Sequence, residues 1–255
     1  FDWKVPKEWN VKEAWLRDPD GKKIADFSKN NLHLVGYSTP INSSFTLNKI
    51  KKHLHTLKNQ PKAIPYVTSY YKRTWGFCIS YNKFKRLKVG KYKVFINSEL
   101  KNGYLTYGEL VIPGKKKKEV FISTNICHPS MANNEISGPV VTIHLAKWIQ
   151  SIKNRKYTYR IIFVPETIGS ITYLSKKYKY LKKNVIAGFN VVCVGDNRCY
   201  SYLPSRNGNT LSDKVAEHVL KLNKKKYVTY GWINRGSDER QYCSPGIDLP
   251  ICTFS

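Results

Sequence analysis

Two patterns of apolar and polar residues divide this chain. From residue 119 onward, short apolar runs typical of buried strands alternate with stretches that have the 3.6-residue period of helices. These patterns predict strands at 119–124, 157–164, 186–194, 227–231 and 249–254, and helices at 138–152, 168–182 and 210–223. Strands that alternate with helices are typical of a sheet covered on both faces. We therefore predict a three-layer α/β fold for this part.

The first part of the chain is rich in Tyr, Val and Phe and reads as mostly β. The turn residues Asp18-Pro19-Asp20-Gly21 predict a hairpin over 15–26. Residues 48–58 have the pattern of a short basic helix, and strand-like runs follow at 64–71, 75–80, 91–98 and 104–112. Pro113-Gly114 and a run of lysines then mark a boundary. We predict a β-rich domain over 1–113 and an α/β domain over 114–255.

Polar residues follow the apolar run at 120–123, where a predicted strand ends. The loop carries Cys127, His128, Asn134 and Glu135, and a predicted helix begins directly after it. In open α/β sheets, ligands bind outside the carboxyl ends of the strands. His128 and Glu135 could equally cap the turn, and this loop alone does not decide between a site and a cap.

Most acidic residues after residue 120 also stand at predicted strand ends. Glu166 ends an apolar strand just before a helix, where its charge suits the helix N-terminus and where it could equally act as a general base. Asp196 follows the next strand in the same way. A histidine and several carboxylates at one rim suit a divalent metal, with zinc as the first choice.

Composition adds little to this interpretation. The net charge of +27 comes mainly from lysine, so we expect non-specific attraction of polyanions but no specific nucleic-acid partner. The six cysteines form no CxxC pair, which favours free thiols in the cytoplasm. We expect no membrane association, because no apolar run reaches the length of a membrane span. The sequence leaves open a homo-oligomer.

Four stretches resemble a bacterial aminopeptidase-like family, catalogued as a domain of unknown function, that carries an inserted β-rich domain. They are ICHPSMANNEISGP (126–139), FVPETIGS (163–170), GDNRCYSYLPSRNGN (195–209) and RGSDERQYCSPGIDLP (235–250). The resemblance covers essentially the whole chain and extends to the di-zinc exo-aminopeptidases. It implies a three-layer α/β fold with zinc at the rim, His128 as a zinc ligand and Glu166 as the general base.

The chain departs from this family at positions that matter. Asn134 stands at the place of the bridging Asp, and Thr167 at the place of the second Glu. The resemblance therefore implies one zinc ion rather than two, held by His128 with Glu135 or Asp196 and a further ligand.

The ends of the chain also bear on the metal. Phe1 is not an initiator Met, and Ser255 directly follows a strand-like run, so we expect material to be missing at both ends. The family continues with a further histidine beyond this point. We accordingly expect the 255-residue chain on its own to hold zinc poorly and to show negligible activity.

The polar residues at the strand ends and the family resemblance together predict a zinc-dependent hydrolase of the aminopeptidase type. It would cleave an amide or peptide bond with Glu166 as base. Its substrate would be a small peptide or a small molecule bearing an amino group, contacted by Asn134, Asp238, Glu239 and Arg240. The alternative is a catalytically impaired binding module that keeps the fold, which the replacements at Asn134 and Thr167 favour.

Overall fold

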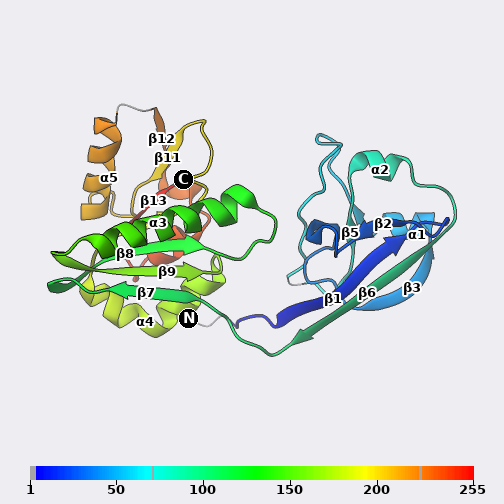
Figure 1. Ribbon diagram of the computed structural model, residues 1–255, viewed down its shortest axis with the longest axis horizontal. Coiled ribbons are helices and arrows are strands. Elements are labelled where there is room, and N and C mark those ends of the chain that lie inside the picture. Colours follow the sequence, from blue (N-terminus) through cyan, green and yellow to red (C-terminus); the bar gives the residue numbers. More distant parts are fainter. Residues whose placement is uncertain (1–3, 71, 224–225) are drawn as a thin grey trace. The chain divides into compact units, whose positions relative to one another are not determined.

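The computed structural model describes residues 4–70, 72–223 and 226–255 (Figure 1). They form two compact units, Lys4–Tyr104 and Leu105–Ser255. The division falls before the boundary predicted near 113, because strand β7 (Gly108–Ile112) pairs with β9 (Tyr157–Val164) of the second unit. A strand at the edge of a sheet is assigned by its hydrogen bonds, which the sequence does not display.

The first unit is built on a four-stranded antiparallel sheet with the order β2-β1-β6-β3. Tyr92, Val94 and Ile96 of β6 alternate into its core, as the two-residue period of a strand requires. The predicted hairpin forms, and Asp18 accepts the backbone N–H groups of Asp20 and Lys22 in its turn. The elements of this unit are β1 (Glu8–Arg17), β2 (Lys23–Asp26), η1 (Asn31–His33), β3 (Ile41–Thr46), α1 (Leu47–Lys51), β4 (Leu54–His55), β5 (Phe77–Cys78), α2 (Tyr81–Lys85) and β6 (Lys91–Lys101).

Two predicted elements of this unit are wrong. The helix expected over 48–58 ends at Lys51, and the chain continues as β4, which pairs with β5. The run 64–70 makes only an isolated bridge at Thr68 and forms no strand among the described residues. Pro65 within this run has no N–H to donate to a neighbouring strand. Tyr71, at the end of the predicted strand, lies outside the described residues.

The second unit contains a seven-stranded sheet with the order β12-β11-β13-β10-β8-β9-β7. Its four central strands are parallel, whereas β7 is antiparallel at one edge and β11 is antiparallel to β13. The elements are β7, β8 (Lys116–Asn125), η2 (Asn133–Ser137), α3 (Gly138–Ser151), β9, α4 (Ile168–Asn184), β10 (Val185–Val191), β11 (Tyr200–Leu203), α5 (Leu211–Leu222), β12 (Tyr227–Thr229), η3 (Trp232–Asn234), α6 (Asp238–Tyr242) and β13 (Ile251–Phe254). Strand β11 and helix α6 were not predicted.

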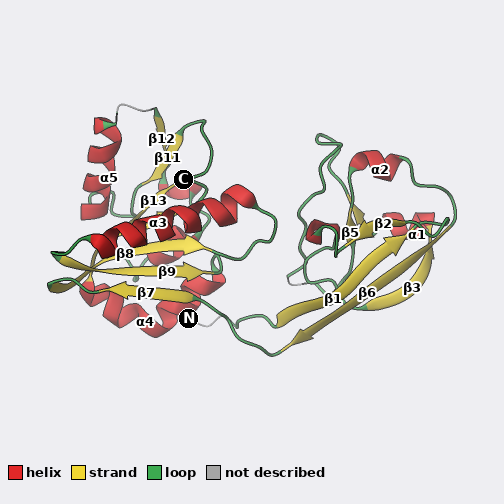
Figure 2. Ribbon diagram, in the orientation of Figure 1, coloured by secondary structure: helices red, strands yellow, loops and turns green. Residues whose placement is uncertain are grey.

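Neighbouring residues of one strand show how the three layers form. Phe121 of β8 packs with Tyr173 and Leu174 of α4, whereas Ile122 packs with Ala146 of α3. Because successive side chains of a strand point to opposite faces, α3 and α4 cover opposite faces of the sheet (Figure 2). The predicted three-layer α/β fold is confirmed.

An ion pair lies inside this sheet. The guanidinium of Arg160 on β9 contacts both carboxylate oxygens of Glu119 on β8, at 2.8 and 3.0 Å. Both residues are buried, and the hydroxyl of Tyr180 on α4 also donates to Glu119 at 2.6 Å. The pair ties two parallel strands and one covering helix together below the rim where polar residues gather.

Candidate metal and hydrolase site

The candidate site is built at the carboxyl end of β8. The loop after this strand passes through η2, one turn of π-helix, and enters α3 without a break. Single π-turns are frequent at functional sites. Gly138 makes this entry possible, since a Cβ there would lie 2.3 Å from the carbonyl oxygen of Val191 and 2.4 Å from Oγ1 of Thr124. The loop is therefore pressed against the ends of β8 and β10.

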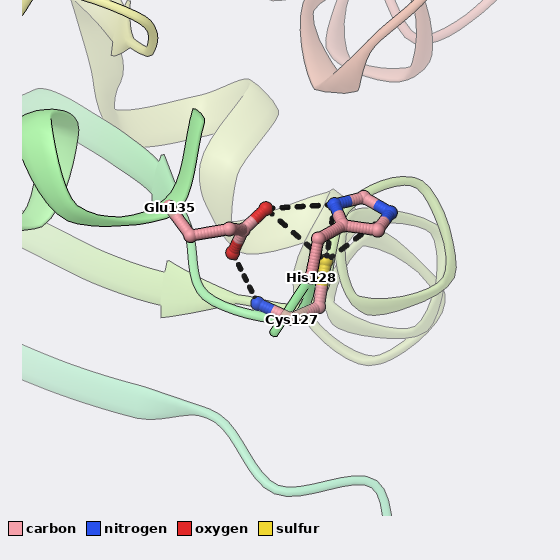
Figure 3. Close-up of side chains that lie close together, drawn as sticks. All are labelled: Cys127, His128 and Glu135. Atoms are coloured by element: carbon pink, nitrogen blue, oxygen red, sulfur yellow. Dashed lines mark hydrogen bonds and ion pairs between the residues drawn. The ribbon is translucent and has the colours of Figure 1, made fainter. Parts of the chain in front are cut away.

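Cys127, His128 and Glu135 form a compact cluster in this loop (Figure 3). Nδ1 of His128 lies 2.7 Å from Oε1 of Glu135 and 3.4 Å from Sγ of Cys127, which in turn lies 3.7 Å from the same carboxylate oxygen. The second oxygen of Glu135, a buried residue, accepts the backbone N–H of Cys127. A sulfur, a nitrogen and an oxygen donor all lie within 4.8 Å of one another.

Glu166 joins this cluster from the end of β9. Its Oε2 lies 3.7 Å from Nδ1 of His128, and its Oε1 accepts a hydrogen bond of 2.5 Å from the hydroxyl of Ser237. Its backbone N–H donates to Sγ of Cys127 at 3.1 Å. The structure thus brings Glu166 and His128 together, although they come from different strand ends.

The electrostatics of the cluster are dominated by burial and by negative charge. Desolvation raises the pKa of the Cys127 thiol to about 12, and the charges of Glu135, Glu166 and Asp238 add to the rise. The residue as a whole is exposed, but its sulfur is enclosed by the backbone of Glu166 and by the carboxylate of Glu135. A cation at this place would offset the excess of negative charge.

Asp238 lies behind the cluster at the start of α6. It is completely buried, and its Oδ1 accepts the backbone N–H of Thr167 at 2.7 Å. Burial raises the pKa of Asp238 from its ordinary value of 3.8 to about 7, and the charges of Glu166 and Glu239 act in the same direction. This carboxylate supports the turn that follows Glu166 and is not open to the surface.

The buried carboxylate of Glu239 accepts hydrogen bonds only from groups inside the protein among the described contacts. Its Oε1 accepts the backbone N–H groups of Gly236 and Ser237 at 3.2 Å, and its Oε2 accepts from the amide of Asn190 at 3.3 Å. Arg240, the next residue, is exposed. The two neighbours therefore differ, since only Arg240 presents its side chain to solvent.

Asn134 and Asp196, two other predicted site residues, differ in whether they lie in the cluster. Oδ1 of Asn134 lies 3.2 Å from Nδ1 of His128, so this amide is part of the cluster. Asp196 is exposed, and its carboxylate pairs with Arg198 at 3.0 Å and accepts from Asn133 at 3.4 Å. The structure does not bring the Asp196 carboxylate into the group of close donor atoms. A neighbouring arginine in the same loop competes for it.

Sequence reasoning missed Cys127 and Ser237. The sequence predicts free thiols, and the described structure does leave the six cysteines without a disulfide. Cys127 nevertheless stands directly before His128 at a strand end, and that adjacency was the available signal. Ser237 gave no such signal, because its contact with Glu166 spans 71 residues.

The fold of the chain is that of zinc aminopeptidases. The zinc aminopeptidase BSAP from Bacillus subtilis superposes with a TM-score of 0.67 at 12% identity, over 99% of this chain and 72% of that chain. A peptidase M28 precursor from Shewanella amazonensis gives 0.60 at 12% identity, over 98% of this chain and 72% of that one. At identities this low, the superpositions establish a shared fold and nothing further.

A family model described as "Domain of unknown function (DUF4910)" matches residues 1–255, so the chain belongs to this family. A relative in Clostridium acetobutylicum, "Putative polysaccharide biosynthesis protein with aminopeptidase-like domain", is 45% identical over 98% of this chain and 57% of its own length. A crystal structure of a "putative peptidase" from Clostridium acetobutylicum gives a TM-score of 0.95 at 44% identity, over 100% of this chain and 60% of that one. The chain thus spans somewhat more than half the length of these relatives.

None of the described helices is both long and apolar enough to cross a membrane.

Proposed function

We propose that this protein is a zinc-dependent hydrolase of the aminopeptidase type. The observation that carries the proposal is the approach of Glu166 to within 3.7 Å of His128, which itself lies 2.7 Å from Glu135, at the rim of an aminopeptidase fold. A metal-binding histidine and carboxylate beside a second carboxylate are the parts that hydrolysis by activated water requires.

The residues present fit a zinc ion. Zinc in proteins is bound by imidazole nitrogen, carboxylate oxygen and thiolate sulfur, and all three donor types meet within 4.8 Å here. His128 and Glu135 would hold the ion, and Asn134 would lie beside them. When bound, zinc would supply Lewis acidity, which activates water and polarises a carbonyl group.

Glu166 would act as the general base and then as the general acid. One carboxylate oxygen accepts the hydroxyl of Ser237, which fixes the plane of the carboxylate. The other oxygen faces His128 and is placed to take a proton from the attacking water and to pass it to the leaving amine. General acid–base catalysis of this kind contributes about 10²–10⁴ in rate.

The substrate would be an amide next to a free amine, on a short peptide or on a small molecule such as an amino sugar. Of the four residues expected to contact it, Asp238 and Glu239 are buried in internal hydrogen bonds. We therefore assign direct contact to Asn134 and Arg240 and a supporting role to the other two. The exposed guanidinium of Arg240 suits the carboxylate end of a peptide.

The second candidate function is a binding module that retains the fold without turnover. Thr167 and Asn134 favour it, because neither supplies the charge that a second metal ion requires. In that case the cluster around His128 would bind a ligand without a metal ion and without hydrolysing an amide.

One set of measurements separates the two functions. The zinc content of the protein is determined by plasma emission, and hydrolysis of leucine p-nitroanilide and of a dipeptide panel is followed with and without added zinc. Glu166→Gln should keep the zinc and lower kcat by about 10²–10⁴. His128→Ala should lose both, and Glu217→Gln, at the surface of α5, should change neither. Zinc-loaded full-length wild type that hydrolyses none of these substrates would favour the binding module.

A further inference from the structure

Two protein ligands do not complete a zinc site, which normally has three or four. Glu166 is assigned as the base, and the other acidic residues considered for the site already make hydrogen bonds or ion pairs elsewhere among the described residues. Asp196 pairs with Arg198, Asp238 holds Thr167, and Glu239 holds the Gly236–Ser237 backbone. None of these three joins the close group of donor atoms.

We propose that Cys127 is the third protein ligand, so that the site is a thiolate–imidazole–carboxylate centre for a borderline-soft cation. The assignment rests on the proposed zinc function and specifies its ligand set. Sγ of Cys127 lies 3.4 Å from Nδ1 of His128 and 3.7 Å from Oε1 of Glu135. With zinc bonds of about 2.3 Å to sulfur and about 2.0–2.1 Å to nitrogen or oxygen, the edges of a tetrahedral site are roughly 3.5 Å, which the two distances to sulfur match. The 2.7 Å between Nδ1 of His128 and Oε1 of Glu135 is that of a hydrogen bond, which a bound cation would replace.

One backbone donor points at the sulfur of Cys127 and would stabilise a metal-bound thiolate, whereas the nearby carboxylates would be offset by the cation itself. The backbone N–H of Glu166 donates to Sγ at 3.1 Å, and a hydrogen bond to an ionised acceptor is stronger than one to a neutral acceptor. The backbone N–H of Cys127 in turn donates to Glu135, which orients the carboxylate of the neighbouring ligand. When the metal binds, the thiol proton passes to solvent, so the exchange is balanced.

The donor set has a consequence for metal preference. Carboxylate and water oxygens alone suit Mg²⁺ and Mn²⁺, whereas a thiolate with an imidazole selects zinc and its close analogue Co²⁺. Cobalt is a direct probe, because a Co²⁺–thiolate bond gives an intense sulfur-to-metal charge-transfer band in the near ultraviolet. Nitrogen and oxygen ligands give only the weak visible bands.

The test is a Co²⁺ titration of the metal-free protein followed by absorption. We expect the charge-transfer band in wild type and in Cys193→Ser, which alters a nearby thiol that contacts Asn134 and lies outside the cluster. Cys127→Ser should keep the visible bands, lose the ultraviolet band, and bind Co²⁺ more than about tenfold more weakly, since changes even to outer-shell partners have effects of this size. Mg²⁺ should not compete.

The outcomes separate this assignment from the proposed function. Visible cobalt bands that need His128 and Glu135 but come without a sulfur band in wild type overturn the Cys127 assignment alone. A sulfur band that persists in Cys127→Ser overturns it as well. Absence of any Co²⁺ or Zn²⁺ binding by the full-length wild-type protein overturns the zinc function itself, and with it the assignment. The absence of a sulfur band in wild type is decisive even if a variant fails to fold.

Discussion

The carboxylate of Asp238 accepts the backbone N–H of Thr167 at 2.7 Å, across 71 residues of sequence. Thr167 has φ 62° and ψ −62°, a conformation that is rarely populated by a β-branched residue. Residues in such conformations persist only where the surrounding structure holds them. Because Thr167 directly follows Glu166, the buried Asp238 fixes the backbone from which the proposed base projects.

Relief of this backbone conformation should stabilise the protein. Thr167→Gly removes the Cβ that disfavours positive φ, and Thr167 makes no side-chain capping bond that would be lost. We expect the free energy of unfolding to rise by about 1 kcal/mol, the balance of strain relief and the greater freedom of Gly in the unfolded chain. Urea denaturation measures the change. Thr172→Gly, inside α4, should instead lower stability, and equal losses for both variants would contradict the strain.

Asp238 should make stability depend on pH in an unusual direction. Its pKa is about 7 in the folded protein and 3.8 ordinarily, so the folded state holds a proton that the unfolded state has released. The stabilisation is fully present below pH 4 and is lost as the pH rises towards 7, by at most ~1.4 kcal/mol per pH unit. Asp238→Asn keeps the acceptor for Thr167 but cannot titrate. Stability of wild type relative to this variant should fall between pH 4 and pH 7, and parallel curves would refute the shifted pKa.

The ion pair of Arg160 and Glu119 should be costly to break. Arg160→Leu leaves the carboxylate of Glu119, 1% exposed, buried without its cation. We expect a loss of about 3–5 kcal/mol in the free energy of unfolding. The exposed pair of Lys221 and Glu217 on α5 is the matched control, and Lys221→Ala should cost less than about 0.5 kcal/mol. Similar losses in the two variants would show that burial does not govern the first pair.

Asp196 and Glu135 should differ in their effect on metal affinity. Glu135→Gln removes the charge 2.7 Å from His128 and should weaken Zn²⁺ binding by more than about tenfold. Asp196→Asn should leave it unchanged, because this carboxylate pairs with Arg198. Competition with a chromophoric chelator gives both affinities. A large loss in Asp196→Asn would restore Asp196 as a ligand.

Much of the second unit was determined by the sequence alone. Strand 157–164 and the start of the helix at 168 were predicted as they stand, since a strand-like run that ends in four apolar residues and a change to helical period are local properties. The placement of Glu166 at a strand end followed from the same pattern. The family resemblance followed from stretches such as FVPETIGS, and the family and fold were confirmed.

Strands that are defined by pairing with distant residues could not be predicted from local sequence patterns. Residues 54–55 and 77–78 become strands because they hydrogen-bond to each other, although the first pair lay within a predicted helix. Strand β7 belongs to the second sheet through its bonds to β9. Four-residue β11 is assigned by contacts with β12 and β13, which carry no signal in its own sequence.

The composition of the candidate site was decided only in three dimensions. The sequence identified His128, Glu135 and Glu166 by their residue types at strand ends. It could not show that Asp196 pairs with Arg198, that Asp238 is buried beneath Thr167, or that the sulfur of Cys127 faces His128 and Glu135. A local pattern determines which element a residue occupies, whereas the direction of its side chain in a loop depends on packing against distant strands. That packing makes the carboxylate of Glu135 part of the cluster and leaves that of Asp196 at the surface.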